Sequence, residues 1–159
     1  MARVALVSGG TRGIGAAISE ALLQAGYRVA ATYAGNVAAA EAFRAKTGAA
    51  VYRWDAADFE ACTAGIREVE AAIGPIDVLV NNAGIVRDSS LHKMTKAQWG
   101  AVIATDLNAL FNMCRPVIEG MRTRKFGRKA GDLGFTRALA LETVDQRRTI
   151  HELSEGERI

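Results

Sequence analysis

The chain has 159 residues, which is the length of one compact domain of about 100–200 residues. Half of the residues are hydrophobic and 23% are charged, and this balance excludes a globally disordered chain. The net charge of +3 is too small to indicate a polyanionic partner by itself. Two cysteines, Cys62 and Cys114, exclude a disulfide framework, and no cysteine or histidine has metal-ligand spacing, so we expect no metal.

The N-terminal residues do not have the pattern of a secretory signal. Their apolar run, Val4–Val7, is four residues long and ends at Ser8-Gly9-Gly10. Elsewhere no segment reaches the roughly 20 apolar residues that a membrane span needs. We therefore expect a soluble protein of the reducing cytoplasm that has no membrane partner.

Strands and helices are predicted to alternate from the first residues to Val80. Apolar runs bounded by glycine or proline predict strands, and apolar residues at helical spacing predict helices. The predicted strands are 3–7, 28–33, 50–54 and 76–80, and the predicted helices are 14–25, 37–46 and 58–73. Strands that alternate with helices form βαβ units. The predicted fold class is therefore α/β, with a Rossmann-like, doubly wound parallel sheet.

The alternation ends after Gly84. Thr95-Lys96-Ala97-Gln98 has the pattern of a capping box and predicts a long helix to about Arg124, interrupted and bent at Pro116. No fifth strand is predicted after residues 126–128, and a further helix is predicted over 129–142. We therefore expect a truncated sheet of about four strands in the order 3-2-1-4, a domain at 1–142 and a polar tail at 143–159.

A glycine-rich loop, Ser8–Gly15, joins the first predicted strand to the first predicted helix. Gly9, Gly13 and Gly15 allow a tight turn and a close approach of the backbone to a ligand. The N–H groups at the start of a helix form an anion site, and this context favours a dinucleotide. The spacing is Gly-x-x-x-Gly-x-Gly rather than Gly-x-Gly-x-x-Gly, and the alternative is a turn that only tolerates glycine.

The residues that follow the second predicted strand favour NADP(H). An NAD site usually has a carboxylate there, which holds the ribose hydroxyls, but Thr32–Asn36 contains none. Arg12, in the glycine loop, is able to pair with a 2′-phosphate. The alternative for Arg12 is an ordinary solvated arginine.

Several motifs together resemble the short-chain dehydrogenase/reductase family. They are the glycine loop, Asp55 after the third strand and Asn81-Asn82-Ala83-Gly84 after the fourth. Within that family the chain is most similar to the NADPH-dependent acetoacetyl-CoA reductases of bacterial polyhydroxybutyrate synthesis. Further segments that carry this resemblance are Tyr52–Asp55, His92–Thr95, Leu110–Met113 and Gly131–Thr136. The resemblance covers residues 1–128 and resumes at 129–142.

The resemblance implies a role for each matching residue of the cofactor site. Gly9, Gly13 and Gly15 would hold the pyrophosphate, together with Ile14 in the same loop. Arg12 would bind the 2′-phosphate, and Asp55 would bind the adenine edge. The residues implied to support the cofactor and the central strand are Asn81, Ala83 and Gly84. As an alternative, Asp55, Asn81 and Asn82 are plain turn residues.

The catalytic half of the family pattern is incomplete. The family transfers a hydride from the nicotinamide to a ketone, while a tyrosine gives the proton and a lysine four residues later lowers the pKa of that tyrosine. Lys129 matches the family lysine, but Lys125 stands four residues before it, and all three tyrosines lie within the first 52 residues. Asp106 matches the family's helix asparagine. We expect a deletion between Arg128 and Lys129 that removes strand five, the serine and the tyrosine.

The function implied by this resemblance is NADPH-dependent reduction of acetoacetyl-CoA, with Lys129 and Asp106 as the remaining catalytic candidates. The alternatives are an inactive NADP(H)-binding or subunit-interaction remnant and a defective product without a settled fold. Partners would be an acyl-CoA, further copies of the chain or a complete paralogue. The basic residues between 122 and 129 are interpreted as a helix C-terminus rather than a nucleic-acid site. Without strand five, Val78–Val80 is expected to form an exposed sheet edge.

Overall fold

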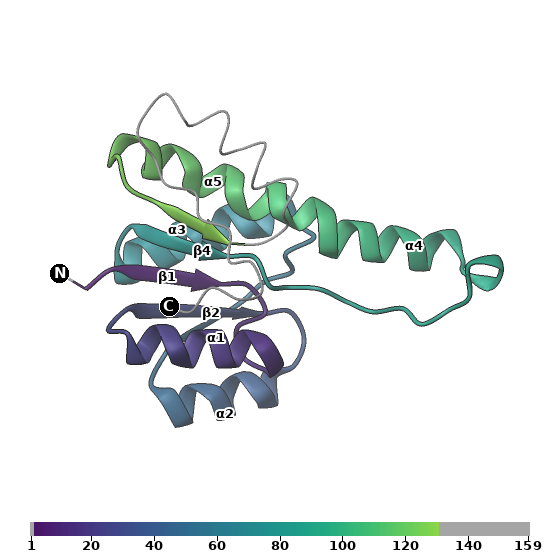
Figure 1. Cartoon of the computed structure of the whole chain (residues 1–159), viewed down its shortest axis with the longest axis horizontal. Coiled ribbons are helices and arrows are strands. Elements are labelled where there is room, and N and C mark those ends of the chain that lie inside the picture. The colour runs from purple at the N-terminus through teal and green to yellow at the C-terminus, as the bar shows by residue number, and fades with distance from the viewer. Residues whose placement is uncertain (1, 131–159) are drawn as a thin grey trace, which may run out of the picture.

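The computed structural model describes residues 2–130 (Figure 1). Its elements follow the predicted alternation of strands and helices through Val80. In chain order they are β1 (Val4–Val7), α1 (Gly13–Gln24), β2 (Arg28–Tyr33), α2 (Val37–Thr47), β3 (Ala50–Arg53), α3 (Phe59–Ile73), β4 (Ile76–Val80), the 3-10 helix η1 (Leu91–Lys93), α4 (Lys96–Val102), the π-helix η2 (Ile103–Asn108), α5 (Ala109–Thr123) and β5 (Arg128–Ala130).

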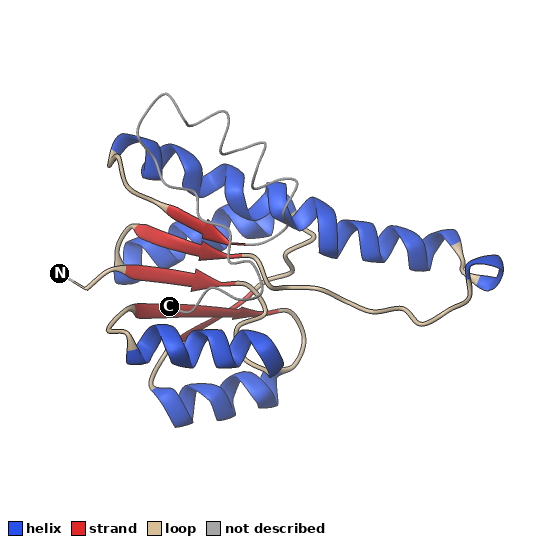
Figure 2. Ribbon diagram, viewed as in Figure 1, coloured by secondary structure: helices blue, strands red, loops and turns tan. Residues whose placement is uncertain are grey.

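The strands form one parallel sheet in the order β3-β2-β1-β4-β5 (Figure 2). The predicted order 3-2-1-4 and the α/β class are confirmed. In the centre of the sheet, Leu6 of β1 pairs with Ala30 of β2 on one side and with Leu79 of β4 on the other. Because all strands run in one direction, the loops that follow β1, β2, β3 and β4 meet at one edge of the sheet.

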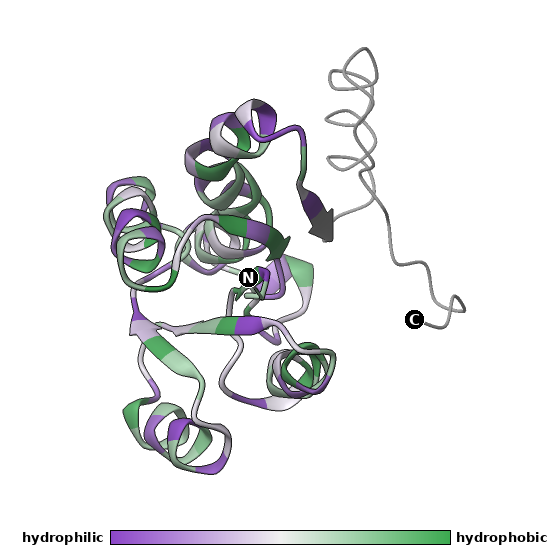
Figure 3. Ribbon diagram, turned by 90° about the vertical axis from the view of Figure 1, so that its left-hand side faces the viewer, coloured by the Kyte–Doolittle hydropathy of each residue, from purple (hydrophilic) through white to green (hydrophobic). Residues whose placement is uncertain are grey.

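Helices cover both faces of the sheet, which is why the central strands are apolar on both sides. On one face Leu6, Ile76 and Leu79 pack with buried residues of α3 and α5. On the other face Ala5, Val7 and Val80 pack against α1, and α2 covers the β2 side of that face. Figure 3 shows this arrangement with the strands between the two layers of helices.

Local sequence signals set the helix ends. The Asp58 carboxylate accepts the Ala61 N–H at 3.0 Å and caps α3. At the end of α2, Gly48 has φ +71, a left-handed conformation that glycine adopts without strain. Thr95 and Gln98 form the predicted capping box at the start of α4.

The long helix that follows differs from the prediction at its interruption. It departs from α-helical geometry at η2, between α4 and α5, while Pro116 lies inside α5. As Figure 1 shows, α4 and the loop after β4 extend beyond the carboxyl edge of the sheet. No helix in the described part of the chain is both long and apolar enough to cross a bilayer.

A fifth strand is present, so two predictions that depended on its absence are wrong. β5 pairs in parallel with β4, with Val78 opposite Arg128 and Val80 opposite Ala130. The edge of β4 is therefore covered, and residues 129 and 130 belong to a strand rather than to a helix. The rest of the helix predicted over 129–142, the domain end at 142 and the tail at 143–159 lie outside the described residues.

The chain reverses after α5 through contacts that sequence patterns do not reveal. Lys125 takes a positive φ of 53°, and the Arg124 guanidinium donates to the Ile76 carbonyl oxygen at 2.6 Å. The Arg3 guanidinium lies 3.9 Å from the ring centroid of Phe126. These contacts attach the reversal to the first residue of β4 and to the residue that precedes β1.

Candidate cofactor site

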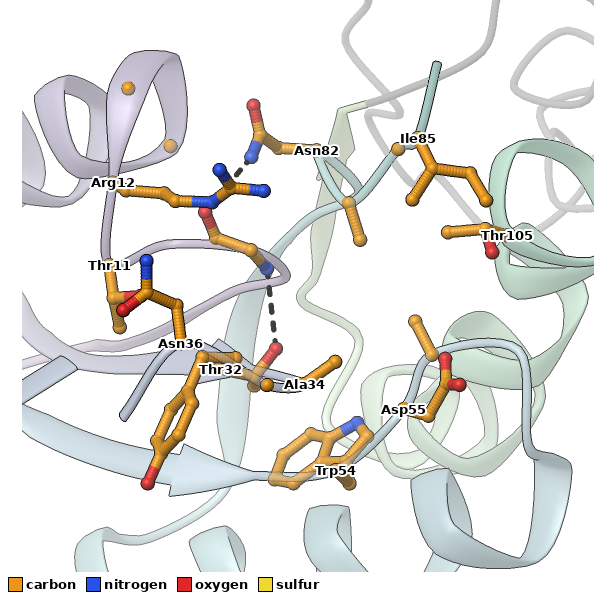
Figure 4. A pocket seen from close by; sticks show the side chains of 18 of the residues that line it. Thr11, Arg12, Thr32, Ala34, Asn36, Trp54, Asp55, Asn82, Ile85 and Thr105 are labelled. Carbon is orange, nitrogen blue, oxygen red and sulfur yellow. Dashed lines mark hydrogen bonds between the residues drawn. The ribbon is translucent and has the colours of Figure 1, made fainter. Parts of the chain in front are cut away.

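A cavity of about 540 Å³ opens at the carboxyl edge of the sheet, among the loops that follow β1, β2, β3 and β4 (Figure 4). A ligand site is expected at this edge in an open parallel sheet. The cavity is lined by Gly9, Thr11, Arg12, Gly13, Ile14, Gly15, Thr32, Tyr33, Ala34, Gly35, Asn36, Trp54, Asp55, Ala56, Asn82, Ala83, Gly84, Ile85 and Thr105. Segments that are far apart in the sequence therefore converge on one volume.

Eight of the predicted cofactor residues line this cavity, and one does not. The eight come from the glycine loop, the end of β3 and the turn after β4: Gly9, Arg12, Gly13, Ile14, Gly15, Asp55, Ala83 and Gly84. Asn81 does not line the cavity, because its Nδ2 is directed at the Cys114 sulfur of α5, 3.4 Å away.

The glycine loop needs its glycines for two different reasons. Gly9 and Gly13 have φ values of +63° and +54°, which residues with a side chain rarely adopt. At Gly15 there is no space for a side chain, because a Cβ there would lie 2.2 Å from the Gly9 carbonyl oxygen. The loop thus folds tightly against the first turn of α1, whose N–H groups have no partner within the helix.

Ser8 and Asn82 join this loop to the end of β4. The Ser8 hydroxyl oxygen accepts the backbone N–H groups of Asn82 and Ala83 at 2.9 and 3.0 Å. In return the Asn82 Nδ2 donates to the carbonyl oxygens of Ser8 and Gly9 at 3.0 and 3.3 Å. This reciprocal bonding fixes one wall of the cavity and gives Asn82 a structural role beyond that of a turn former.

The residues from Thr32 to Asn36 line the cavity on the β2 side and include no carboxylate. Arg12 is exposed at the N-cap position of α1, without a side-chain capping bond, and lies across the cavity from Asp55 in Figure 4. Asn36 caps α2 through a bond from the Ala39 N–H at 3.0 Å, so α2 begins at the same wall. Arg53 donates from Nε to the Ala34 carbonyl oxygen at 3.1 Å and holds the intervening loop.

Of the two predicted catalytic residues, Asp106 is described with its side chain and does not line the cavity. The Asp106 carboxylate, in η2, accepts the Ile85 backbone N–H at 2.9 Å and so holds the segment that leaves β4. The backbone of Lys129 lies in β5 opposite Leu79. The three tyrosines lie at or near the first three strands, and Tyr33 is the one that lines the cavity, on the β2 side.

The sequence interpretation missed several cavity residues. Thr32 accepts the Gly9 N–H at 3.3 Å through its hydroxyl oxygen, and Trp54 is buried in the floor. Thr105 reaches the cavity from η2, 20 residues after Ile85 in the sequence. An apolar or threonine side chain carries no chemical signal in a sequence, so none of these was identifiable before the loops were placed together.

These features fit a dinucleotide. The glycine loop lines the cavity with backbone at Gly9, Gly13 and Gly15, next to the N–H groups of a helix start. The cavity has a cation at one side, Arg12, and a carboxylate at the other, Asp55. Within residues 2–130 no group of three or more His, Cys, Asp and Glu side chains is arranged to hold a metal ion.

Comparison with known proteins supports the same assignment. A model of the short chain dehydrogenase family matches residues 3–129. The acetoacetyl-CoA reductases of Shinella zoogloeoides and Paracoccus denitrificans are 55% and 53% identical to this chain, over 98% of it and 74% of each relative. The 3-oxoacyl-[acyl-carrier-protein] reductase of Vibrio harveyi is 32% identical over 97% of this chain and 72% of that protein.

The length of these alignments is informative as well. The alignment with the Shinella protein extends over 178 positions, which exceeds the 159 residues of this chain. That relative therefore has residues inside the aligned span that this chain lacks, as an internal deletion requires.

The family match over most of the chain, the sheet order and the glycine loop lead to one conclusion. This chain belongs to the short-chain dehydrogenase family, whose members use a nicotinamide cofactor.

Proposed function

We propose that this chain binds NADP(H) in the cavity at the carboxyl edge of its sheet. The observation that carries the proposal is the convergence of the glycine loop, Arg12 and the carboxylate-free loop after β2 on one volume. The residues that would hold the pyrophosphate are Gly9, Gly13, Ile14 and Gly15. Arg12 would pair with the 2′-phosphate, and Asp55 would accept the adenine amino group.

The reaction that we propose for this lineage is reduction of acetoacetyl-CoA to 3-hydroxybutyryl-CoA, in the cytoplasm and as a step of polyhydroxybutyrate synthesis. The support is the similarity to the acetoacetyl-CoA reductases named above. The bound cofactor would supply a hydride to the carbonyl carbon. The protein must then deliver a proton to the carbonyl oxygen from an acid within hydrogen-bond reach.

A second candidate function, binding of NADP(H) without turnover, is favoured by the placement of the catalytic candidates. Lys129 lies in β5, whereas the family pattern needs it one helical turn after a tyrosine, and the residue four positions earlier is Lys125. Asp106 is used to hold Ile85. The described residues thus supply the cofactor half of the site more fully than the proton-donating half.

One experiment separates these candidates. NADPH binding by the purified chain is measured by fluorescence titration, and NADPH consumption is then measured with acetoacetyl-CoA. Lys129→Ala is compared with Lys93→Ala, which removes an exposed lysine of η1. Turnover that only Lys129→Ala abolishes supports the reductase, and binding without turnover supports the second candidate. Absence of binding contradicts both.

The proposed partners follow from the same two candidates. An active chain takes an acyl-CoA substrate, and either form assembles as a homo-oligomer or with a complete paralogue that retains the tyrosine. Light scattering of the purified chain, alone and mixed with such a paralogue, tests the assembly. A mixed species with turnover beyond that of the paralogue alone would assign the chain a role as a subunit.

A further inference from the structure

Side chains of α3 and α5 that do not line the cavity hold the turn after β3. Asn112 of α5 is only 6% exposed, and its Nδ2 donates a hydrogen bond to the Ala56 carbonyl oxygen at 3.0 Å. The Cys62 sulfur of α3 lies 3.5 Å from the same oxygen and 3.7 Å from the Asp55 carbonyl oxygen. Asp55 and Ala56 themselves line the cavity. The turn is therefore held by side chains that do not line the cavity.

Asn112 is unusual in its position. Its neighbours in α5, Met113 and Cys114, belong to the apolar core formed with α3 and the sheet. A buried amide costs free energy unless it is hydrogen-bonded, and an apolar side chain would avoid that cost. The bond to Ala56 joins residues 56 positions apart in the sequence and connects α5 to a wall of the cavity.

Two further contacts lie next to this connection. Phe111 stacks on Phe59 at the start of α3, with 5.8 Å between ring centroids and 22° between ring planes. Within the turn, the Asp55 Oδ1 accepts the Ala57 N–H at 2.9 Å, which fixes the carboxylate in one orientation. The position of α5 and the orientation of the Asp55 carboxylate are therefore linked through Ala56.

We infer that Asn112 is a positioning residue for the adenine end of the cofactor, acting through Ala56 to keep the Asp55 carboxylate toward the adenine amino group. The inference rests on the proposed function, in which Asp55 accepts that group. Asn112 lies behind the turn and touches no ligand, so it would set the orientation of the acceptor and not contribute a contact.

The thiol of Cys62 does not replace the amide. Burial, followed by the Asp58 and Asp55 carboxylates, raises the pKa of the Cys62 thiol to about 12, so it stays protonated at neutral pH. A thiol is a weak donor compared with an amide N–H. Without Asn112 the Ala56 carbonyl would keep only this weak donor from the helices described here, and the turn would gain freedom.

The test compares two ligands that differ at one group. NADPH carries the adenine amino group, and reduced nicotinamide hypoxanthine dinucleotide phosphate carries an oxygen there. A hydrogen bond to a charged acceptor predicts that the unaltered chain binds NADPH about tenfold more tightly than the analogue. In Asn112→Leu, which is similar in volume, we expect the two dissociation constants to fall within about twofold of each other.

The ratio distinguishes positioning from general damage to the fold. Asn108→Leu, an exposed asparagine at the start of α5 without a capping bond, is the matched control and should keep the tenfold ratio. Asn112→Ser, whose hydroxyl is too short to reach Ala56, gives the same test if the leucine variant does not fold. A ratio retained in the Asn112 variants, or absent from the unaltered chain, overturns the inference. Failure of the unaltered chain to bind either nucleotide instead rejects the proposed function, and the inference with it.

Discussion

At the scale of single residues, Arg12 is the side chain on which the choice between NADP(H) and NAD(H) depends. It is exposed at the start of α1, and the loop after β2 has no carboxylate that would repel a 2′-phosphate. We expect Arg12→Gln to weaken NADPH binding about 10- to 100-fold, since it removes a charge-assisted hydrogen bond. NADH binding should change less than about twofold, as fluorescence titration of both nucleotides will show.

The control for Arg12 is a second exposed arginine. Arg67 lies on α3, which packs on the opposite face of the sheet from α1. Arg67→Gln changes the net charge by the same amount as Arg12→Gln. Equal losses in both variants would mean that NADPH responds to overall charge. Tighter binding of NADH than of NADPH by the unaltered chain would contradict the assignment of the cofactor.

Cys62 predicts a pH dependence of stability. Its thiol pKa is raised from 9.0 to about 12 in the folded protein, mainly by burial. Below pH 9 the thiol is protonated in both states, and between pH 9 and 12 only the unfolded chain loses the proton. The free energy of unfolding should therefore fall by about 1 kcal/mol from this group between pH 8 and 10.

Urea denaturation at pH 8 and pH 10 measures this effect as a difference. Cys62→Ala removes the thiol, so its free energy of unfolding should fall about 1 kcal/mol less than that of the unaltered chain over the same interval. Other titrating groups are common to both proteins and cancel. Parallel pH profiles would show that the thiol ionises as easily in the folded protein as in the unfolded one.

At the scale of elements, the sequence predicted regular structure well wherever one residue type has one physical role. Thr95 caps a helix as predicted, and Asp58 and Gly48 cap or end helices in the same way, because a cap depends on neighbouring residues alone. The bounds of β2 and β4 are those expected from their apolar runs. The glycine loop was predictable for the same reason, because it joins two elements that are adjacent in the sequence.

The elements that the sequence did not predict depend on distant contacts. Arg128-Lys129-Ala130 has no strand pattern, and β5 follows a turn that Arg124 attaches to Ile76. The π-helix η2 likewise coincides with the bond between Asp106 and Ile85. Cavity residues such as Thr105 and Ala56 are selected by the packing of loops, which one-dimensional spacing does not encode.

The glycine that precedes β5 gives a testable prediction about this strand. Gly127 lies between the turn and the strand, and a Cβ there would come within 2.5 Å of the Met121 sulfur and 2.7 Å of the Met121 Cβ. We expect Gly127→Ala to displace the return of the chain and to expose the edge of β4. Hydrogen exchange of the Val78–Val80 amides should then be faster than in the unaltered chain.

Gly100→Ala is the matched control, because a Cβ at that position in α4 meets nothing within 4 Å. It should leave the exchange of Val78–Val80 unchanged. Equal exchange in all three proteins would mean that β5 does not protect β4 in solution. The edge would then be open to another strand, with the aggregation hazard of an unpaired apolar edge.

At the scale of the whole molecule, the residues of the proposed cofactor site are present in this chain, whereas the tyrosine of the family's catalytic pattern is not. Within residues 2–130, the cavity is lined by residues of the loops after β1 to β4, the start of α1 and Thr105 of η2. The family tyrosine is absent from the sequence, whose three tyrosines all precede residue 53. The proposed nucleotide site therefore includes none of the residues that the family pattern assigns to proton donation.

The last prediction concerns the stability of the whole chain with its ligand. A folded binding domain unfolds cooperatively, and a ligand that binds only the folded state adds about 2.7 kcal/mol at 100 times its dissociation constant. For a chain of this size that corresponds to a rise in Tm of roughly 5–10 °C. Differential scanning fluorimetry with NADPH should show this rise, and NADH at the same concentration should give a smaller one because Arg12 has no phosphate to bind. A cooperative transition that neither nucleotide moves would leave the fold intact and contradict the cofactor site, whereas the absence of any transition would show that the chain has no settled fold.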